Sequence, residues 1–99
     1  MNNLGDLYYN GYGVQQDYLR AKYYYEKAAN LNYSDAFIML GDIYYYGYGV
    51  EQDYLKSKDF YEKSSDSDNA EGLVKLGDLY YHGYGVKQDY LKARQYYEI

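Results

Sequence analysis

The sequence repeats itself every 36 residues, and this period constrains the fold more than any other feature. Leu4-Gly5-Asp6 returns as Leu40-Gly41-Asp42 and again as Leu76-Gly77-Asp78. A fixed period of this length is typical of repeat proteins, in which each unit buries its apolar side against the next unit. Residues that recur for packing are not free for catalysis, so the period also argues against an enzyme.

The second copy predicts a helix near residues 35–46. Apolar side chains in this span recur at helical spacing, and Ser34 or Asp35 offers an N-cap. Gly47 is expected to end the helix in the left-handed conformation. Each copy is therefore expected to begin with one helix that stops at a glycine.

A second helix is predicted near residues 53–65, with Asp53 as its N-cap. In the third copy, Asp68 and Glu71 give a start signal close to residue 69. The prediction is an all-α fold, an α/α solenoid or superhelix of helix-turn-helix repeats. The chain is read as one domain, 1–99, with repeats at about 1–33, 34–68 and 69–99. Burial between units is expected for Leu40, Tyr44, Ala21, Tyr25 and Tyr61.

Composition limits the partners. The formal net charge of −5 argues against nucleic acid, whose phosphates would be repelled. The absence of cysteine excludes disulfides and thiolate metal sites. The longest apolar run, Ala36 to Leu40, is too short for a bilayer, and the first residues lack the features of a secretion signal. We therefore expect no membrane partner; the compartment stays open, with the cytoplasm favoured.

The recurrent residues resemble the Sel1-like repeat family, which is related to tetratricopeptide repeats. In the first copy the matching positions are Leu4, Gly5, Tyr8, Gly11, Gly13, Val14, Asp17, Ala21, Tyr24, Tyr25, Lys27 and Ala28. All have counterparts 36 residues later, and all but Ala28 have counterparts 72 residues later. Ser57, Ser64 and Ser65 depart from the usual alanines. The resemblance implies a superhelix that scaffolds protein–protein contacts and has no chemistry or cofactor of its own.

No catalytic or metal-binding pattern stands out. His82 is the only histidine, and Asp66-Ser67-Asp68-Asn69 lacks the spacing of a calcium loop. The Gly11-Tyr12-Gly13 turn and its two counterparts have no P-loop lysine, and glycine there suits positive φ. We predict no catalytic residue, no metal site and no cofactor.

Charge differs between the two helices of each repeat. The first helices (1–10, 35–46 and 71–82) carry five acids and one base, whereas the second helices carry seven acids and eight bases. The resemblance implies that the first helices line a concave groove where ligands bind. The residues expected to face this groove are Asp6, Tyr9, Asn10, Asp42, Tyr45, Tyr46, Asp78, Tyr81 and His82. Carboxylates beside phenol rings suit an extended peptide that bears Lys or Arg.

The same residues also have a structural interpretation. The recurrent Asp of the first helix can hold the neighbouring loop through backbone hydrogen bonds. The charges of the second helices can form solvated pairs within one helix, such as Asp59 with Lys63. Both interpretations of the Asp residues stay open.

Three functions follow from these observations. The first is a protein-interaction module that binds a protein or peptide segment, expected to be basic. The second is a structural or self-assembling spacer of a longer solenoid. The third, a hydrolase, lacks a nucleophile–base pair. Because both ends fall within a unit, the chain is read either as a fragment or as an open unit that stacks head to tail. The expected stacking residues are Tyr96, Tyr97, Leu79 and Tyr80 at one end, and Leu4 and Tyr8 at the other.

Overall fold

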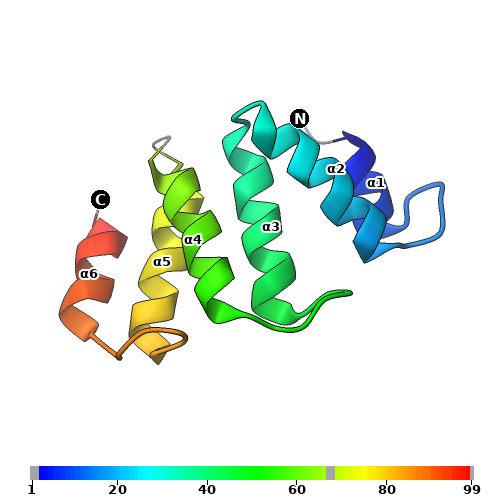
Figure 1. The fold of residues 1–99 in the computed structure, drawn as a ribbon. Helices are drawn as coiled ribbons and strands as arrows, with labels where there is room; N and C mark the ends of the chain where they lie inside the picture. Colours follow the sequence, from blue (N-terminus) through cyan, green and yellow to red (C-terminus); the bar gives the residue numbers. More distant parts are fainter. Residues whose placement is uncertain (1–2, 67–68, 99) are drawn as a thin grey trace.

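The chain forms a row of α-helices. The computed structural model describes residues 3–66 and 69–98, and these contain six helices and no strand. The helices are α1 (Asn3–Asn10), α2 (Tyr18–Asn30), α3 (Ser34–Tyr46), α4 (Tyr54–Ser65), α5 (Ala70–His82) and α6 (Tyr90–Glu98). Each helix packs mainly against its neighbours in sequence, so the row runs from α1 to α6 across a body 43 Å long (Figure 1). The predicted all-α solenoid of helical hairpins is confirmed.

The turn between the two helices of a repeat is built as predicted. The Gly47 N–H donates to the carbonyl of Ile43 (2.9 Å), and Gly47 has a φ of 73°. A side chain at this left-handed position would be strained, which is why glycine ends the helix. The Asp53 carboxylate then accepts the N–H groups of Leu55 and Lys56 (both 3.1 Å) and caps α4.

The predicted N-caps of the first helices are wrong in detail. The α3 cap is Tyr33, which makes no side-chain cap hydrogen bond, and Ser34 is already helical. The reason is that the Ser34 hydroxyl accepts a hydrogen bond from the Asn69 amide (3.1 Å), so it joins α3 to the next repeat instead. Asp68 lies outside the described residues, and α5 is capped by Asn69, which accepts the Glu71 N–H (3.0 Å).

The core lies between consecutive helices. One buried cluster contains Ala21, Tyr25, Ala29, Ala36, Leu40 and Ile43, and the other contains Ile38, Tyr61, Leu76 and Leu79. Four of the five predicted core residues are buried. Tyr44 is the exception: it is half-buried because its ring stacks on Phe60 at the outer edge of the α3–α4 hairpin (centroids 5.8 Å apart).

Glycine permits close packing inside each hairpin. A methyl group on Gly41 would overlap the ring of Tyr61, and Gly5 and Gly77 stand in the same relation to Tyr25 and Tyr97. The glycine of the recurrent Leu-Gly-Asp motif therefore lets a tyrosine of the second helix lie flat on the first helix. This contact explains why that glycine recurs inside a helix despite its low helix propensity.

Two of the three serines that replace alanines, Ser57 and Ser64, are buried but hydrogen-bonded. The Ser57 hydroxyl donates to the Gly41 carbonyl (2.9 Å), and the Ser64 hydroxyl donates to the Tyr61 carbonyl (2.7 Å). Ser64 also fills the space that a methyl group on Gly72 would need. Buried hydroxyls with partners are tolerated in a core, so the serines do not disturb the repeat.

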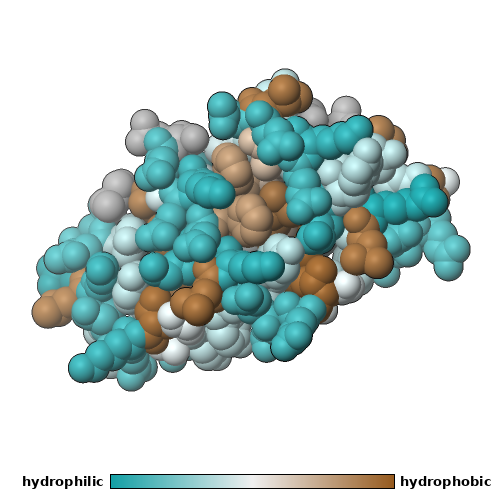
Figure 2. All heavy atoms as spheres, viewed as in Figure 1, coloured by the Kyte–Doolittle hydropathy of each residue, from teal (hydrophilic) through white to brown (hydrophobic). Residues whose placement is uncertain are grey.

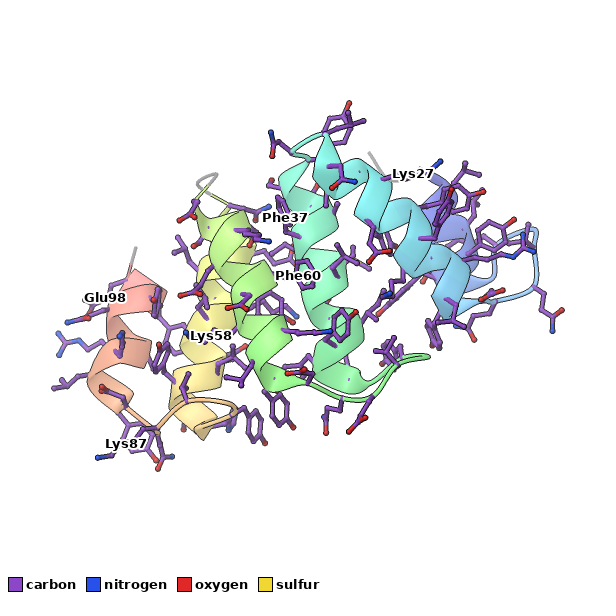
Figure 3. The ribbon with its side chains drawn as sticks, viewed as in Figure 1. Lys27, Phe37, Lys58, Phe60, Lys87 and Glu98 are labelled. Carbon is purple, nitrogen blue, oxygen red and sulfur yellow. The ribbon has the colours of Figure 1, made fainter. Side chains whose placement is uncertain are left out.

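One side of the molecule has an apolar centre with a polar border (Figure 2). Phe37 of α3 and Phe60 of α4 lie side by side there (Figure 3). The Lys63 ammonium stands 5.5 Å from the Phe60 ring centroid and 6.0 Å from that of Phe37. Among the described residues, no helix has the length and apolar character needed to cross a bilayer.

Candidate functional site

The nine predicted groove residues occupy corresponding positions on α1, α3 and α5, which we call the first-helix face. Asn10, Tyr46, Tyr81 and His82 are exposed on it. The other five, Asp6, Tyr9, Asp42, Tyr45 and Asp78, are partly buried. The face therefore presents aromatic, amide and imidazole groups to solvent, with the carboxylates set deeper.

The three aspartates hold the second helix of their own repeat. Asp6 accepts the Tyr25 hydroxyl at 2.6 Å, and Asp42 accepts the Tyr61 hydroxyl at 2.5 Å. The Tyr97 hydroxyl donates to Asp78 in the same way (2.5 Å). The structural interpretation thus gains a specific partner, a tyrosine hydroxyl of the second helix rather than loop backbone. Each carboxylate has a second oxygen, so this bond does not exhaust its capacity to accept.

These contacts change the acidity of the tyrosines. Burial and the hydrogen bond to Asp6 raise the pKa of Tyr25 well above its usual 10. Burial and the charge of Asp42 raise the pKa of Tyr61 in the same direction. Burial and the charge of Asp42 also raise the pKa of Tyr9 to about 12. All three hydroxyls therefore stay protonated and able to donate at neutral pH.

Asp42 has a further partner that Asp6 lacks. The Lys75 ammonium of α5 lies 3.3 Å from Asp42 Oδ1 and joins the second repeat to the third. The corresponding residue 36 positions earlier is Met39, which cannot pair with Asp6. The central carboxylate of the first-helix face is therefore partly neutralised within the chain.

The rings of the first-helix face form one continuous line of contacts, which we call the aromatic strip. Within repeats, Tyr45 contacts Tyr46 (4.8 Å between centroids) and Tyr81 contacts His82 (5.0 Å). Two turn residues, Tyr48 and Tyr84, complete the line between repeats. The strip runs Tyr9, Tyr48, Tyr46, Tyr45, Tyr84, His82, Tyr81. Five of the predicted site residues are thus brought together across three repeats.

The sequence analysis missed the turn residues that organise the strip. Tyr48 stacks on Tyr18 of the preceding repeat (4.6 Å, 11° between planes), and Tyr84 stacks on Tyr54 (4.8 Å, 8°). The signal was the recurrence of an aromatic residue between two glycines, at a position where a turn alone needs no ring. This signal could have suggested a contact between repeats.

A recurrent glutamine, also missed, fastens each turn. The Gln52 amide donates to the Tyr45 carbonyl (2.7 Å) and to the Tyr54 hydroxyl (3.1 Å). Gln16 and Gln88 make the same pair of contacts in the other repeats. The glutamine joins the end of the first helix to the start of the second and so holds the rings of the strip in place.

The second helices carry their charges in pairs within one helix, as expected, but the partners differ from the prediction. Lys58 pairs with Glu62 (3.7 Å), and Arg94 pairs with Glu98 (2.8 Å). Figure 3 labels Lys58 on α4 and Glu98 on α6. The predicted Asp59–Lys63 pair is wrong because Lys63 lies over the rings of the α3–α4 hairpin instead. Exposed pairs of this kind contribute little stability.

Within the described ranges, no three His, Cys, Asp or Glu side chains gather in a way that could hold a metal ion. His82 stacks on Tyr84 (5.0 Å) and serves as a ring of the strip. The site can therefore offer shape, aromatic surface and carboxylates to a ligand, which are features that bind a partner.

The family model for the Sel1 repeat matches residues 1–33, 34–69 and 70–99. The chain belongs to the Sel1 repeat family. Sel1 repeats form a non-catalytic fold that generally mediates protein–protein interaction. Among curated proteins, none matches this chain.

Two solved structures are similar over 98% of the chain. One is a Sel1 repeat protein from Oxalobacter formigenes, with a TM-score of 0.91 and 33% identity. The other is a protective antigen of uropathogenic Escherichia coli strains that displays an SLR fold, with a TM-score of 0.89 and 38% identity. The chain spans 40% of the first protein and 21% of the second, so it corresponds to a portion of each.

Proposed function

We propose that the first-helix face binds an extended segment of a protein partner along the aromatic strip. The observation that supports this most strongly is the continuity of the strip over three repeats, with Tyr46 and Tyr81 each about half exposed (51% and 48%). Tyrosine is enriched among the residues that dominate binding energy, because its ring gives a large contact area and its hydroxyl can pair. An extended peptide matches a site that repeats at regular intervals.

We further propose that the segment is basic. Asp6, Asp42 and Asp78 lie beside the rings, and Lys or Arg can combine charge pairing with a cation–π contact there. Lys75 already neutralises part of the charge of Asp42. The outer two carboxylates are therefore expected to contribute more to the preference than the central one.

The test uses fluorescent peptides of equal length that carry either Lys and Arg or Glu. Changing Tyr46→Ala and Tyr81→Ala together should weaken binding of the basic peptide by tenfold or more, since hot-spot residues each cost about 2 kcal/mol. Tyr23→Ala on α2 is the matched control, because Tyr23 is equally exposed (51%) but lies outside the strip. Equal loss in the control and the strip variant would contradict the proposed site.

The charge proposal has a separate test. Asp6→Asn, Asp42→Asn and Asp78→Asn together keep an oxygen that can accept the tyrosine hydroxyl, while removing three charges. We expect weaker binding of the basic peptide and a flatter dependence on salt. If affinity and salt dependence stay unchanged, the carboxylates serve only the fold.

A second candidate function is supported by the two end faces. Leu4 is 52% exposed, whereas its counterparts Leu40 and Leu76 are each 1% exposed. Val74 is 46% exposed, whereas its counterpart Ile38 is 2% exposed. Each end thus carries apolar residues that an adjacent repeat covers elsewhere, and we propose that the unit stacks on other repeats as a spacer. Sedimentation over a range of concentrations tests whether copies associate.

A further inference from the structure

We propose that copies of this chain join head to tail, with the Gly11-Tyr12-Gly13 turn of one copy docking in a hollow on α6 of another. This inference rests on the second candidate function and names its contact. The hollow lies on the side of the third repeat that faces away from the second. Its lining is Tyr81, Tyr90, Ala93, Arg94, Tyr97 and Glu98.

The junctions inside the chain supply the template. Where the second repeat meets the first, Tyr48 stacks on Tyr18, and Gly49 lies against the Tyr18 side chain. Where the third repeat meets the second, Tyr84 stacks on Tyr54 with the same geometry, and Gly85 lies against Tyr54. At both junctions the Gly-Tyr-Gly turn, which we call the plug, packs on the first tyrosine of the second helix of the preceding repeat. We call that tyrosine and its surroundings the seat.

The third repeat offers the same seat, and no residue in 3–66 or 69–98 occupies it. Tyr90 corresponds to Tyr18 and Tyr54, and it is 61% exposed. Its ring meets Tyr81 edge to face (5.3 Å), as the Tyr18 ring meets Tyr9 (5.5 Å). The seat is therefore already shaped as it is in the occupied junctions.

The first repeat offers the same plug, which no part of the chain that the structure describes receives. Tyr12 is 64% exposed, and a methyl group on Gly13 would meet nothing within 4 Å. The turn is nonetheless preformed: φ is 72° at Gly11 and 74° at Gly13, compared with 73° at both Gly47 and Gly49. Docking would therefore order little that is not already ordered, which lowers the entropic cost of association.

The expected stacking residues need a correction at the α6 end. Leu79 is buried at the junction with the second repeat, and Tyr80 is buried within the third repeat, where it stacks on Tyr96 (5.7 Å). They cannot belong to an exposed face. The exposed seat consists of Tyr90, Tyr81 and Tyr97. Tyr81 also belongs to the aromatic strip, and Tyr97 is the tyrosine whose hydroxyl donates to Asp78.

The geometry of this contact predicts open chains. Plug and seat lie at opposite ends of the row of helices, so each copy that docks leaves a free plug and a free seat. Such a heterologous contact adds copies until a rotation happens to close a ring. Association is therefore expected to grow with concentration rather than stop at a dimer.

Engineered cysteines test the contact directly, because the natural chain has none. Protein with Tyr12→Cys is mixed with protein with Tyr90→Cys under mild oxidation, and a disulfide between copies is expected. One chain with Tyr18→Cys and Tyr48→Cys is the positive control, since those two residues form the internal junction. Tyr23→Cys mixed with Tyr90→Cys is the negative control, because Tyr23 is exposed but lies on no end face. If the yield of disulfide between Tyr12→Cys and Tyr90→Cys is no greater than the yield in this negative control, the proposed contact is wrong.

Sedimentation separates this contact from stacking in general. Tyr12→Ala and Tyr90→Ala alter exposed residues, so circular dichroism should be unchanged while the average mass falls to that of a monomer. If the natural chain associates but neither variant matters, stacking stands and the named contact is wrong. If the natural chain stays a monomer up to about 1 mM, the affinity is too weak for either proposal. Tyr81 belongs to both the strip and the seat, so peptide binding is measured at concentrations where the chain is a monomer, and Tyr46, which lies outside the seat, reports on the peptide site alone.

Discussion

Tyr61 and Tyr97 hold the same position in successive repeats but differ in environment. Both rings lie on a helical glycine, and both hydroxyls donate to an aspartate at 2.5 Å. Tyr61 is 1% exposed, whereas Tyr97 is 43% exposed. The contacts made within a repeat are thus the same, and the burial differs.

The difference comes from the adjacent repeat. Ile38 and Tyr61 share a buried cluster with Leu76 and Leu79 of α5, whereas Tyr97 has no following helix over it among the described residues. A hairpin positions its own tyrosine, but only a neighbouring repeat removes that tyrosine from water. Stability in such an array is therefore the sum of units and of junctions between units.

The largest expected effect is loss of the fold in alkali. Tyr9, Tyr25 and Tyr61 have pKa values raised above the unfolded value of 10. The folded chain keeps these protons while the unfolded chain loses them, so the stability they confer is complete below pH 10 and is lost as pH rises beyond it. We expect unfolding between about pH 10 and 12, followed by circular dichroism.

Tyr61→Phe sharpens this test of the buried tyrosine. This substitution removes one group whose pKa is raised by folding. The slope of the free energy of unfolding against pH in that range should therefore fall by up to about 1.4 kcal/mol per pH unit. Tyr12→Phe is the control for removing a hydroxyl from a site that is open to water, because Tyr12 is 64% exposed. A fold that is unchanged at pH 12 would contradict the assignment.

The next effect compares the two tyrosines directly. Tyr61→Ala should lower the free energy of unfolding by roughly 3–5 kcal/mol, because it empties a closed site. Tyr97→Ala should cost less than half of that, since its site is open to water. Urea unfolding measures both variants; equal losses would show that the junction adds nothing to the burial of Tyr61.

A smaller effect concerns the α4–α5 junction. Gly72→Ala should destabilise by about 1–3 kcal/mol, because the methyl group overlaps the Ser64 hydroxyl. Adding Ser64→Ala gives this junction the same two alanines as the preceding one, where Ala28 and Ala36 stand at the corresponding positions. Most of the lost free energy of unfolding should then be recovered. A double-mutant cycle by urea unfolding gives the coupling; additive losses would show that the two sites do not share space.

The smallest expected effect on stability comes from Lys75. Lys75→Met copies Met39 of the preceding repeat and should change stability by less than about 1 kcal/mol, since ion pairs near the surface are weak. It also frees Asp42, so binding of the basic peptide should strengthen. Lys58→Met, which breaks a pair on α4, is the matched control. Weaker peptide binding after Lys75→Met would contradict the charge proposal.

Much of the fold was predictable because its determinants are local. The helical spacing, the cap at Asp53 and the left-handed Gly47 depend on residues within one turn of each other, and these predictions are confirmed. The starts of α3 and α5 lie within one residue of the prediction, but their caps were predicted at the wrong residues. The Ser34 hydroxyl bonds across repeats to Asn69 instead of capping α3, and Asn69 caps α5.

The candidate site was predictable only in part for the same reason. The nine residues could be placed on the first helices from their period. The stack of Tyr48 on Tyr18 joins residues of different repeats, and no local sequence pattern predicts it. The Lys75–Asp42 pair occurs once, so the period could not reveal it.

The pairing of each helix with its neighbours in sequence has a consequence for how the chain folds. Among the described residues, the longest side-chain hydrogen bond in sequence joins Asn69 to Ser34, 35 positions apart. Folding therefore never has to bring distant segments together, and chains with such local contacts fold quickly. The α3–α4 hairpin is covered on both sides and is the natural nucleus, from which order can spread in either direction. Amide protons of α6 should exchange with solvent sooner than those of α3.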